Sequence, residues 1–312
     1  MTADKSSVSR RAWLTTAAVG PAIALGVGAQ PVLAKQAAVA QGVQGLPASG
    51  FFIQHAVLKV NDLSANIKFW CEGLGMKLVR ERTIDNVRTV FLAYGKETLS
   101  SGDGGYFALE LTQAQKPVYG VGSSFKYLGL TLPDKPMTLG IRATDAGGEI
   151  VPHWFLEKDF VEIKSPDGVP VRVKSGARRD PVTVVAFGSN DVKATQAYYK
   201  DTLRMKEQRG GLLKLLGPLA GDGPVLGYDG SDVSVVLVKE DAPVTQGQIF
   251  DKIAILTKNT VGMADAISKT NYGKVEFVGE APGIGTKVAD TIDPEFHDVV
   301  FVDYDDFEKE LV

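Results

Sequence analysis

The chain has 312 residues, of which 44% are hydrophobic and 23% charged, so it is long enough to bury substantial cores and most simply forms two domains. Its formal net charge is -3 at pH 7, and no basic stripe interleaved with aromatic residues appears, so no nucleic-acid partner is expected. The single cysteine, Cys71, excludes an internal disulfide.

The N-terminal segment differs in composition from the rest of the chain. Arg10 and Arg11 precede an apolar run rich in alanine and glycine, Leu14 to Val27, and V-L-A at 32–34 has the small-residue spacing of a leader-peptidase site. We interpret residues 1–34 as a twin-arginine-type export signal; the alternative is a short membrane anchor. The expected destination is a thylakoid lumen or a bacterial periplasm, with no membrane span after signal removal.

A strand and a helix follow a flexible leader at residues 35–50. Residues 51–60 alternate as a strand does, so His55 and Lys59 share one face. Asp62 is a good N-cap, and the apolar residues after it recur at three- and four-residue steps. The sequence therefore predicts a strand, a tight turn and an amphipathic helix, with a histidine on the polar face of the strand.

The same strand–helix pattern occurs twice. Residues 191–205 align without a gap with residues 62–76 and share Asp, Ala, Leu and Met, which indicates an internal duplication. Three further strands follow the first helix, and four such βαβββ modules account for nearly all of the chain after the leader. We predict an α+β fold with two cup-shaped domains, 51–176 and 182–312, joined by a linker at 177–181.

Several stretches at both ends of this region carry a family pattern. They are H-A-V-L-K-V-N-D-L, I-K-F-W-C-E-G-L-G-M-K-L-V-R-E-R, F-L-A-Y-G and F-A-L-E-L-T, and later G-I-G-T-K-V, D-P-E and V-F-V-D-Y-D-D-F-E-K-E-L. Their order and spacing resemble glyoxalase I (lactoylglutathione lyase) of the vicinal-oxygen-chelate superfamily, in its two-domain plant-type form. The resemblance implies isomerisation of the methylglyoxal–glutathione hemithioacetal to S-lactoylglutathione, assisted by nickel, cobalt or zinc.

The resemblance also implies particular site residues. The family holds its metal on the first and last strands of two modules, and His55 and Glu110 fall on these positions in the first module. Glu110 is also implied as the catalytic carboxylate that moves the proton. Lys59 falls where an arginine usually binds a glutathione carboxylate, and lysine keeps the charge but not the bidentate geometry.

The other ligand positions depart from the family pattern. They fall on Tyr127 and Arg172 in the second module, Val184 and Val236 in the third, and Lys252 and Val300 in the fourth. Whether the first module pairs with the second or the fourth, two of the four donors are missing. An arginine or lysine at such a position repels a cation.

Two hypotheses follow for the function. The first is a metal-dependent lyase that uses His55, Glu110 and Lys59 on a glutathione conjugate. The second is a descendant that kept the cup without a metal, either as a non-catalytic small-molecule binder or as a structural subunit of a lumenal or periplasmic complex. The loss of donors favours the second. The buried carboxylate of Glu110 then needs another cation, for which Lys59 or Arg172 is available.

Overall fold

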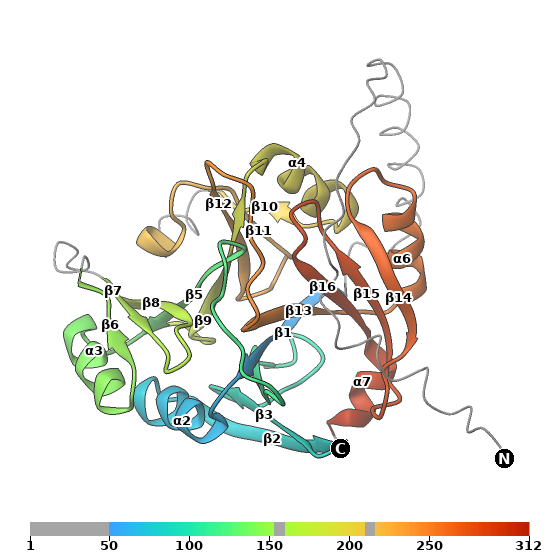
Figure 1. Cartoon of the computed structure of the whole chain (residues 1–312). Coiled ribbons are helices and arrows are strands. Elements are labelled where there is room, and N and C mark those ends of the chain that lie inside the picture. The colour runs from blue at the N-terminus through green and yellow to red at the C-terminus, as the bar shows by residue number, and fades with distance from the viewer. Residues whose placement is uncertain (1–49, 153–159, 210–215, 312) are drawn as a thin grey trace, which may run out of the picture.

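The computed structural model describes residues 50–152, 160–209 and 216–311 (Figure 1). The predicted export signal, residues 1–34, and nearly all of the predicted leader lie outside these residues, so both stay predictions. Within the described part of the chain, no helix is long and apolar enough to cross a membrane.

The first half of the chain contains two copies of the strand–helix–three-strand module. The first consists of β1 (Phe52–Val60), α2 (Leu63–Lys68), η1 (Phe69–Gly73), β2 (Lys77–Ile84), β3 (Val87–Ala93) and β4 (Ala108–Gln113). The second consists of β5 (Phe125–Leu132), α3 (Pro136–Asp145), β6 (Glu149–Ile150), β7 (Phe160–Lys164) and β8 (Pro170–Ser175).

The second half repeats the module twice more and adds a terminal helix. The third module consists of β9 (Val182–Ser189), α4 (Val192–Ala197), η3 (Tyr198–Thr202), β10 (Lys206–Glu207), η4 (Gly217–Leu219), β11 (Val225–Gly227) and β12 (Ser234–Lys239). The fourth consists of β13 (Phe250–Thr257), α6 (Thr260–Ser268), β14 (Lys274–Glu280), β15 (Lys287–Ile292) and β16 (Asp298–Asp303), followed by α7 (Tyr304–Glu310). The predicted α+β fold of four βαβββ modules is confirmed.

The helices of the first and third modules begin in the same way. The carboxylate of Asp62 accepts the Ala65 N–H at 2.9 Å, and that of Asp191 accepts the Ala194 N–H at 3.0 Å. Each cap satisfies a backbone donor that a helix start leaves open. Both helices then continue into a π-helical turn, η1 or η3. The match between residues 62–76 and 191–205 therefore extends to local structure.

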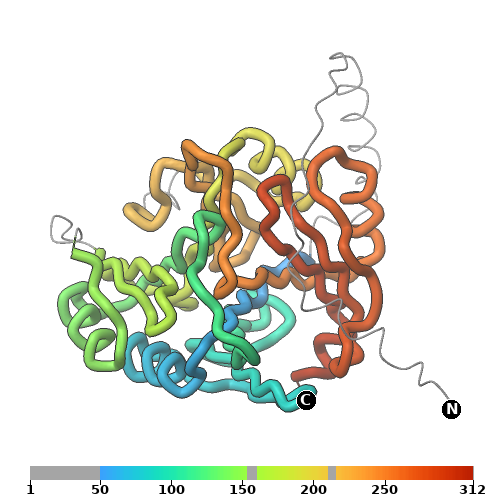
Figure 2. Tube along the Cα trace, viewed as in Figure 1, coloured from blue at the N-terminus to red at the C-terminus, as the bar shows by residue number. Residues whose placement is uncertain are grey.

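The modules pair into two eight-stranded sheets. One sheet has the order β14-β15-β16-β13-β1-β4-β3-β2 and joins the first and fourth modules through the antiparallel pair β1–β13. The other has the order β10-β11-β12-β9-β5-β8-β7-β6 and joins the second and third through β5–β9. Figure 2 shows the blue-to-cyan first module beside the red fourth module. Each sheet combines a module from residues 51–176 with one from 182–312, and the domain boundary at 177–181 stays a prediction.

The main core lies between each sheet and its helices. Leu58 and Val60 on β1 belong to the same buried cluster as Trp70 of η1. Because side chains alternate along a strand, His55 and Lys59 then project from the opposite face, which we call the inner face. Helix α7 packs on this inner face through Phe307, which belongs to a second buried cluster.

Candidate functional site

The inner face of the first–fourth sheet carries the predicted site residues, and a bulge in β1 shapes it. The register between β1 and β13 shifts after Ile53, so that Gln54 and His55 together lie opposite Ala254. A β-bulge of this kind turns two consecutive side chains towards one face. Gln54 and His55 therefore lie side by side in the buried interior, with 0% and 9% exposure.

The structure brings the two predicted metal ligands together. Strands β1 and β4 are parallel, and their register places Glu110 opposite Val57, two residues along from His55. His55 Nε2 lies 3.4 Å from Glu110 Oε2, and both side chains are largely buried. The pairing that the family resemblance implied for these two residues is thus present geometrically.

The cation beside Glu110 is Arg82. Its Nη2 donates to Glu110 Oε1 at 3.0 Å. Arg80 lies two residues earlier on β2 and on the same face, and its guanidinium carbon is 3.6 Å from the ring centroid of Phe91. The guanidinium carbon of Arg82 is 4.9 Å from the same centroid. Neither arginine was predicted as a site residue, although the R-E-R alternation in β2 places both on one face.

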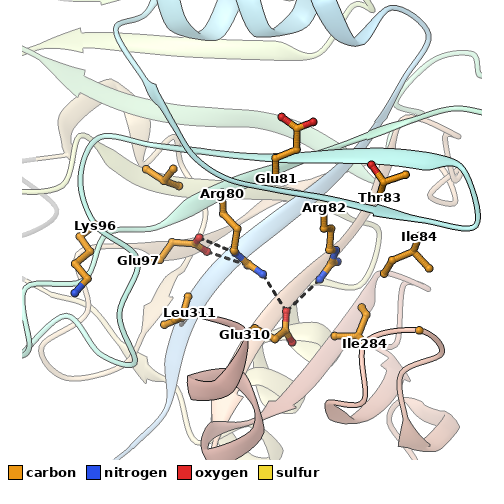
Figure 3. Close-up of a pocket in the computed structure, with 12 residues that line it drawn as sticks. Arg80, Glu81, Arg82, Thr83, Ile84, Lys96, Glu97, Ile284, Glu310 and Leu311 are labelled. Atoms are coloured by element: carbon orange, nitrogen blue, oxygen red, sulfur yellow. Dashed lines mark hydrogen bonds and ion pairs between the residues drawn. The ribbon is translucent and has the colours of Figure 1, made fainter.

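Helix α7 contributes a carboxylate to both arginines (Figure 3). Glu310 Oε2 accepts from Arg80 Nη1 at 3.0 Å and from Arg82 Nη1 at 3.1 Å. Arg80 also donates through Nε and Nη2 to Glu97 at 3.0 and 3.2 Å. No local sequence pattern predicts Glu97 or Glu310 as a partner of these arginines, because both come from other segments and contact the arginines only in the folded chain.

These hydrogen bonds and ion pairs form a closed ring of side chains. Gln54 Nε2 donates to Glu97 Oε1 at 2.9 Å, and Gln54 Oε1 contacts His55 Nδ1. We call the resulting set the polar ring, in the order Gln54, His55, Glu110, Arg82, Glu310, Arg80 and Glu97. Buried charges are tolerated when each has hydrogen-bonded partners, as they have here.

The polar ring fixes the tautomer of His55. Because the amide nitrogen of Gln54 is engaged by Glu97, its oxygen faces His55 and accepts the Nδ1 proton. The Nε2 lone pair then points at Glu110. Burial lowers the pKa of His55 well below its usual value, and Arg80, Arg82 and Lys252 lower it further, so the imidazole is neutral. Burial raises the pKa of Glu110, and the charges of Arg82, Arg80 and Lys252 oppose this shift.

A second charged group lies beside the polar ring. We call it the lysine–aspartate cluster, formed by Lys59, Asp251, Lys252, Asp290 and Asp298. Lys252 Nζ is 3.5 Å from Asp290 Oδ2, and Lys59 pairs with Asp251. Burial raises the pKa of Asp298 to about 7, although Lys252 opposes the shift. Lys59, predicted for substrate binding, thus already has a carboxylate partner.

The residues present do not fit a tightly held divalent metal. His55 Nε2 and Glu110 Oε2 converge, but the other oxygen of Glu110 is bound to Arg82, and the fourth-module positions hold Lys252 and Val300. Across residues 50–152, 160–209 and 216–311, no group of three or more His, Cys, Asp and Glu side chains could hold a metal ion. Nickel, cobalt or zinc sites use more donors than two side chains provide.

A cavity of about 850 Å³ opens between β2 and α7. Its polar lining includes Arg80, Arg82, Lys96, Glu97 and Glu310 (Figure 3). Ile84, Ile284 and Leu311 supply an apolar part. This volume lies within the range of small-molecule sites, and the lining combines convergent charges with an apolar part.

The inner face of the other sheet is filled instead. Tyr127, Val184 and Val236, three of its ligand positions, belong to one buried apolar cluster with Leu219 of η4. The fourth position, Arg172, donates to Glu162 at 2.7 Å and lies 4.1 Å from the ring centroid of Tyr127. Arg172 therefore does not pair with Glu110. The alternative in which Arg172 supplies the cation for Glu110 is wrong.

Comparisons with known proteins agree with this architecture. The Glyoxalase/Bleomycin resistance protein/Dioxygenase superfamily matches residues 52–172. A probable chloroplastic lactoylglutathione lyase of Arabidopsis thaliana is 30% identical over 276 residues, covering 82% of this chain and 74% of that protein. A lactoylglutathione lyase of Oryza sativa subsp. japonica is 28% identical over 284 residues, covering 82% and 91%.

A solved structure extends the likeness to the whole fold. Glyoxalase I from Zea mays matches with a TM-score of 0.70 at 27% sequence identity, covering 84% of this chain and 95% of that one. The match therefore spans both sheets rather than a single module. The resemblance seen in the sequence is confirmed, and the chain belongs to the glyoxalase family of the vicinal-oxygen-chelate superfamily.

Proposed function

We propose that this protein binds a small anionic molecule in the cavity between β2 and α7 and does not carry out the metal-dependent lyase reaction. The observation that carries the proposal is the salt bridge of 3.0 Å between Arg82 and Glu110. It places a permanent cation on the carboxylate that the lyase reaction would need for its metal and its proton transfer. Lys252 adds a second positive charge beside His55 and Glu110, since its charge lowers the pKa of both residues.

The cavity supports the binding part of the proposal. Two guanidinium groups face it, and they recognise carboxylates and phosphates through paired N–H donors. Its volume of about 850 Å³ accommodates a small molecule. A glutathione conjugate, the ligand implied by the family resemblance, carries two carboxylates and belongs to this chemical class.

The test is turnover of the hemithioacetal with nickel, cobalt and zinc added in turn to purified protein. We expect no S-lactoylglutathione above the uncatalysed rate. A matched positive control is a lactoylglutathione lyase relative assayed in parallel. Metal-dependent turnover that disappears in His55→Ala would overturn the proposal.

A second candidate is the lactoylglutathione lyase reaction itself. One observation favours it: the Nε2 lone pair of His55 and Glu110 Oε2 face each other across 3.4 Å. In this candidate His55 and Glu110 are the metal ligands, and Lys59 leaves Asp251 to bind a glutathione carboxylate. It requires turnover that falls in His55→Ala, Glu110→Gln and Lys59→Gln, so the same assay separates the two candidates.

For localisation, we propose that residues 1–34 direct export by a twin-arginine route to a lumen or periplasm, where the protein could also join an assembly. Arg10 and Arg11 before an apolar run support this. Residues 1–34 fused to a reporter should reach the bacterial periplasm, and Arg10→Lys with Arg11→Lys should abolish export. Export of the double variant at the original rate would contradict the route.

A further inference from the structure

We propose that Arg80 and Arg82 form a carboxylate-binding site whose present occupant is the chain's own Glu310, and that a small-molecule carboxylate binds by displacing it. The inference rests on the proposed function and deepens it, because it names the ligand class and the residue that competes with the ligand. It assigns to the terminal helix α7 the role of an internal competitor.

Glu310 binds both arginines through one oxygen. A single oxygen, Oε2, accepts from Arg80 Nη1 at 3.0 Å and from Arg82 Nη1 at 3.1 Å. The other oxygen accepts from the Thr286 hydroxyl. The Glu310 side chain is 14% exposed, so the carboxylate is held inside the rim of the cavity. A ligand carboxylate in this position would find the same two charged donors.

Both guanidinium groups also have partners other than Glu310. Arg80 uses Nε and Nη2 for Glu97 and stacks on Phe91, and Arg82 uses Nη2 for Glu110. Each arginine therefore turns its Nη1 to Glu310 while its contact with Glu97 or Glu110 anchors it. When Glu310 leaves, the two Nη1 groups stay in place, so little ordering entropy opposes ligand binding.

The two Nη1 groups need an acceptor. Arg80 and Arg82 are permanently charged, and Glu310 Oε2 is the acceptor that their Nη1 groups share. Glu310 supplies this carboxylate in the structure described above, and the ligand supplies it in the bound state. Loss of Glu310 without replacement is unfavourable, which makes exchange, rather than simple opening, the expected event.

Helix α7 is anchored ahead of its C-terminal turn. Phe307 is 1% exposed and anchors α7 on the inner face, and Asp306 accepts the Lys287 N–H at 3.1 Å. Beyond Phe307, the backbone contact of Leu311 is a 3.2 Å bond to Glu308. Unwinding residues 308–311 therefore releases Glu310 from the cavity and removes Leu311 from the edge of the cluster that holds Phe307, while Phe307 itself stays docked.

The apolar lining narrows the ligand class further. Ile84 from β2, Ile284 from the loop before β15 and Leu311 at the C-cap of α7 surround the arginines (Figure 3). The ligand we infer has one carboxylate for the arginines and an apolar part for this wall. Hexanoate has both features, and hexanamide is its neutral analogue of the same shape, so the pair separates charge recognition from apolar binding.

The experiment is calorimetric titration of the full chain with hexanoate and hexanamide. Glu310→Gln keeps the size of the side chain and removes its charge, and we expect it to lower the Kd for hexanoate at least about tenfold while leaving hexanamide unchanged. Glu308→Gln, an exposed carboxylate on the same helix, is the matched control and should behave as the original protein. Adding Arg80→Gln to Glu310→Gln should remove the gain.

The outcomes separate this inference from the proposed function. A hexanoate Kd that is unchanged or higher in Glu310→Gln would overturn the inference, as would an equal gain for hexanamide. A thermal melt of each variant shows that it is folded, and a structural role for Glu310 alone would lower Tm without improving binding. Metal-dependent turnover would instead overturn the proposed function and leave the displacement result standing.

Discussion

The two inner faces of this molecule started from the same duplicated module and now differ in chemistry. In the second–third sheet, Tyr127, Val184 and Val236 close the interior with apolar packing. In the first–fourth sheet, buried acids and bases remain and form the polar ring and the lysine–aspartate cluster. Apolar filling is the less costly way to stabilise an interior, so the persistence of buried charge on one face is consistent with the binding role proposed for that face.

The largest expected effect comes from rebuilding the missing donors of the polar face. Lys252→His with Val300→Glu reproduces in the fourth module the histidine and glutamate of the first. We expect nickel or zinc binding to appear with at least about a thousandfold gain in affinity over the unchanged protein, because four donors replace two and a cation is removed. Calorimetric titration measures it, and Val184→His with Val236→Glu is the control in the filled sheet, where burial should cause misfolding instead.

The next effect is on stability. Arg82→Gln removes the cation from buried Glu110, and we expect a loss of about 3 kcal/mol in the free energy of unfolding. The loss should be larger at pH 8 than at pH 5, because the raised pKa of Glu110 allows it to take up a proton at the lower pH. Urea unfolding at the two pH values measures this. An equal loss at both values would contradict the role of Glu110 charge.

A third effect is the pH dependence that Asp298 contributes. Its pKa is raised to about 7 in the folded protein, above its unfolded value, so it stabilises the fold below about pH 4 and that contribution is lost as pH rises towards 7. Asp298→Asn should remove up to about 4 kcal/mol of the pH-dependent change in the free energy of unfolding between pH 4 and pH 8. Urea unfolding from pH 4 to 8 measures it, and an unchanged slope would show that Asp298 titrates normally.

The smallest expected effect lies in the filled sheet. Arg172→Gln breaks the pair with Glu162, and the two side chains are 29% and 13% exposed. Solvent reaches this pair more easily than it reaches Glu110, so we expect a loss of about 1 kcal/mol. A loss as large as that of Arg82→Gln would remove the energetic difference between the two inner faces.

Local patterns in the sequence were sufficient for the modules but not for their assembly. The alternation in β1 and the cap at Asp62 are local properties, and both predictions agree with the structure. The bulge that turns Gln54 towards His55 depends on pairing with β13, which is far away in the sequence. Local sequence patterns therefore do not predict this register shift.

The site was only partly predictable for the same reason. His55 and Glu110 were found because they lie on ligand positions of a family pattern. Arg82 could have been predicted from the strand pattern, since side chains alternate along β2 and place Arg80 and Arg82 on one face. Glu310 could not be predicted in this way. A carboxylate on a short terminal helix is usually exposed to solvent, and only the fold brings Glu310 to the arginines.

The central claim is that cations of the protein itself have replaced the metal beside Glu110. Titration of the purified chain with nickel, cobalt and zinc tests it most directly. The account predicts no saturable binding of any of the three at micromolar concentration, in the original protein or in His55→Ala. Stoichiometric binding that is lost in His55→Ala would contradict it.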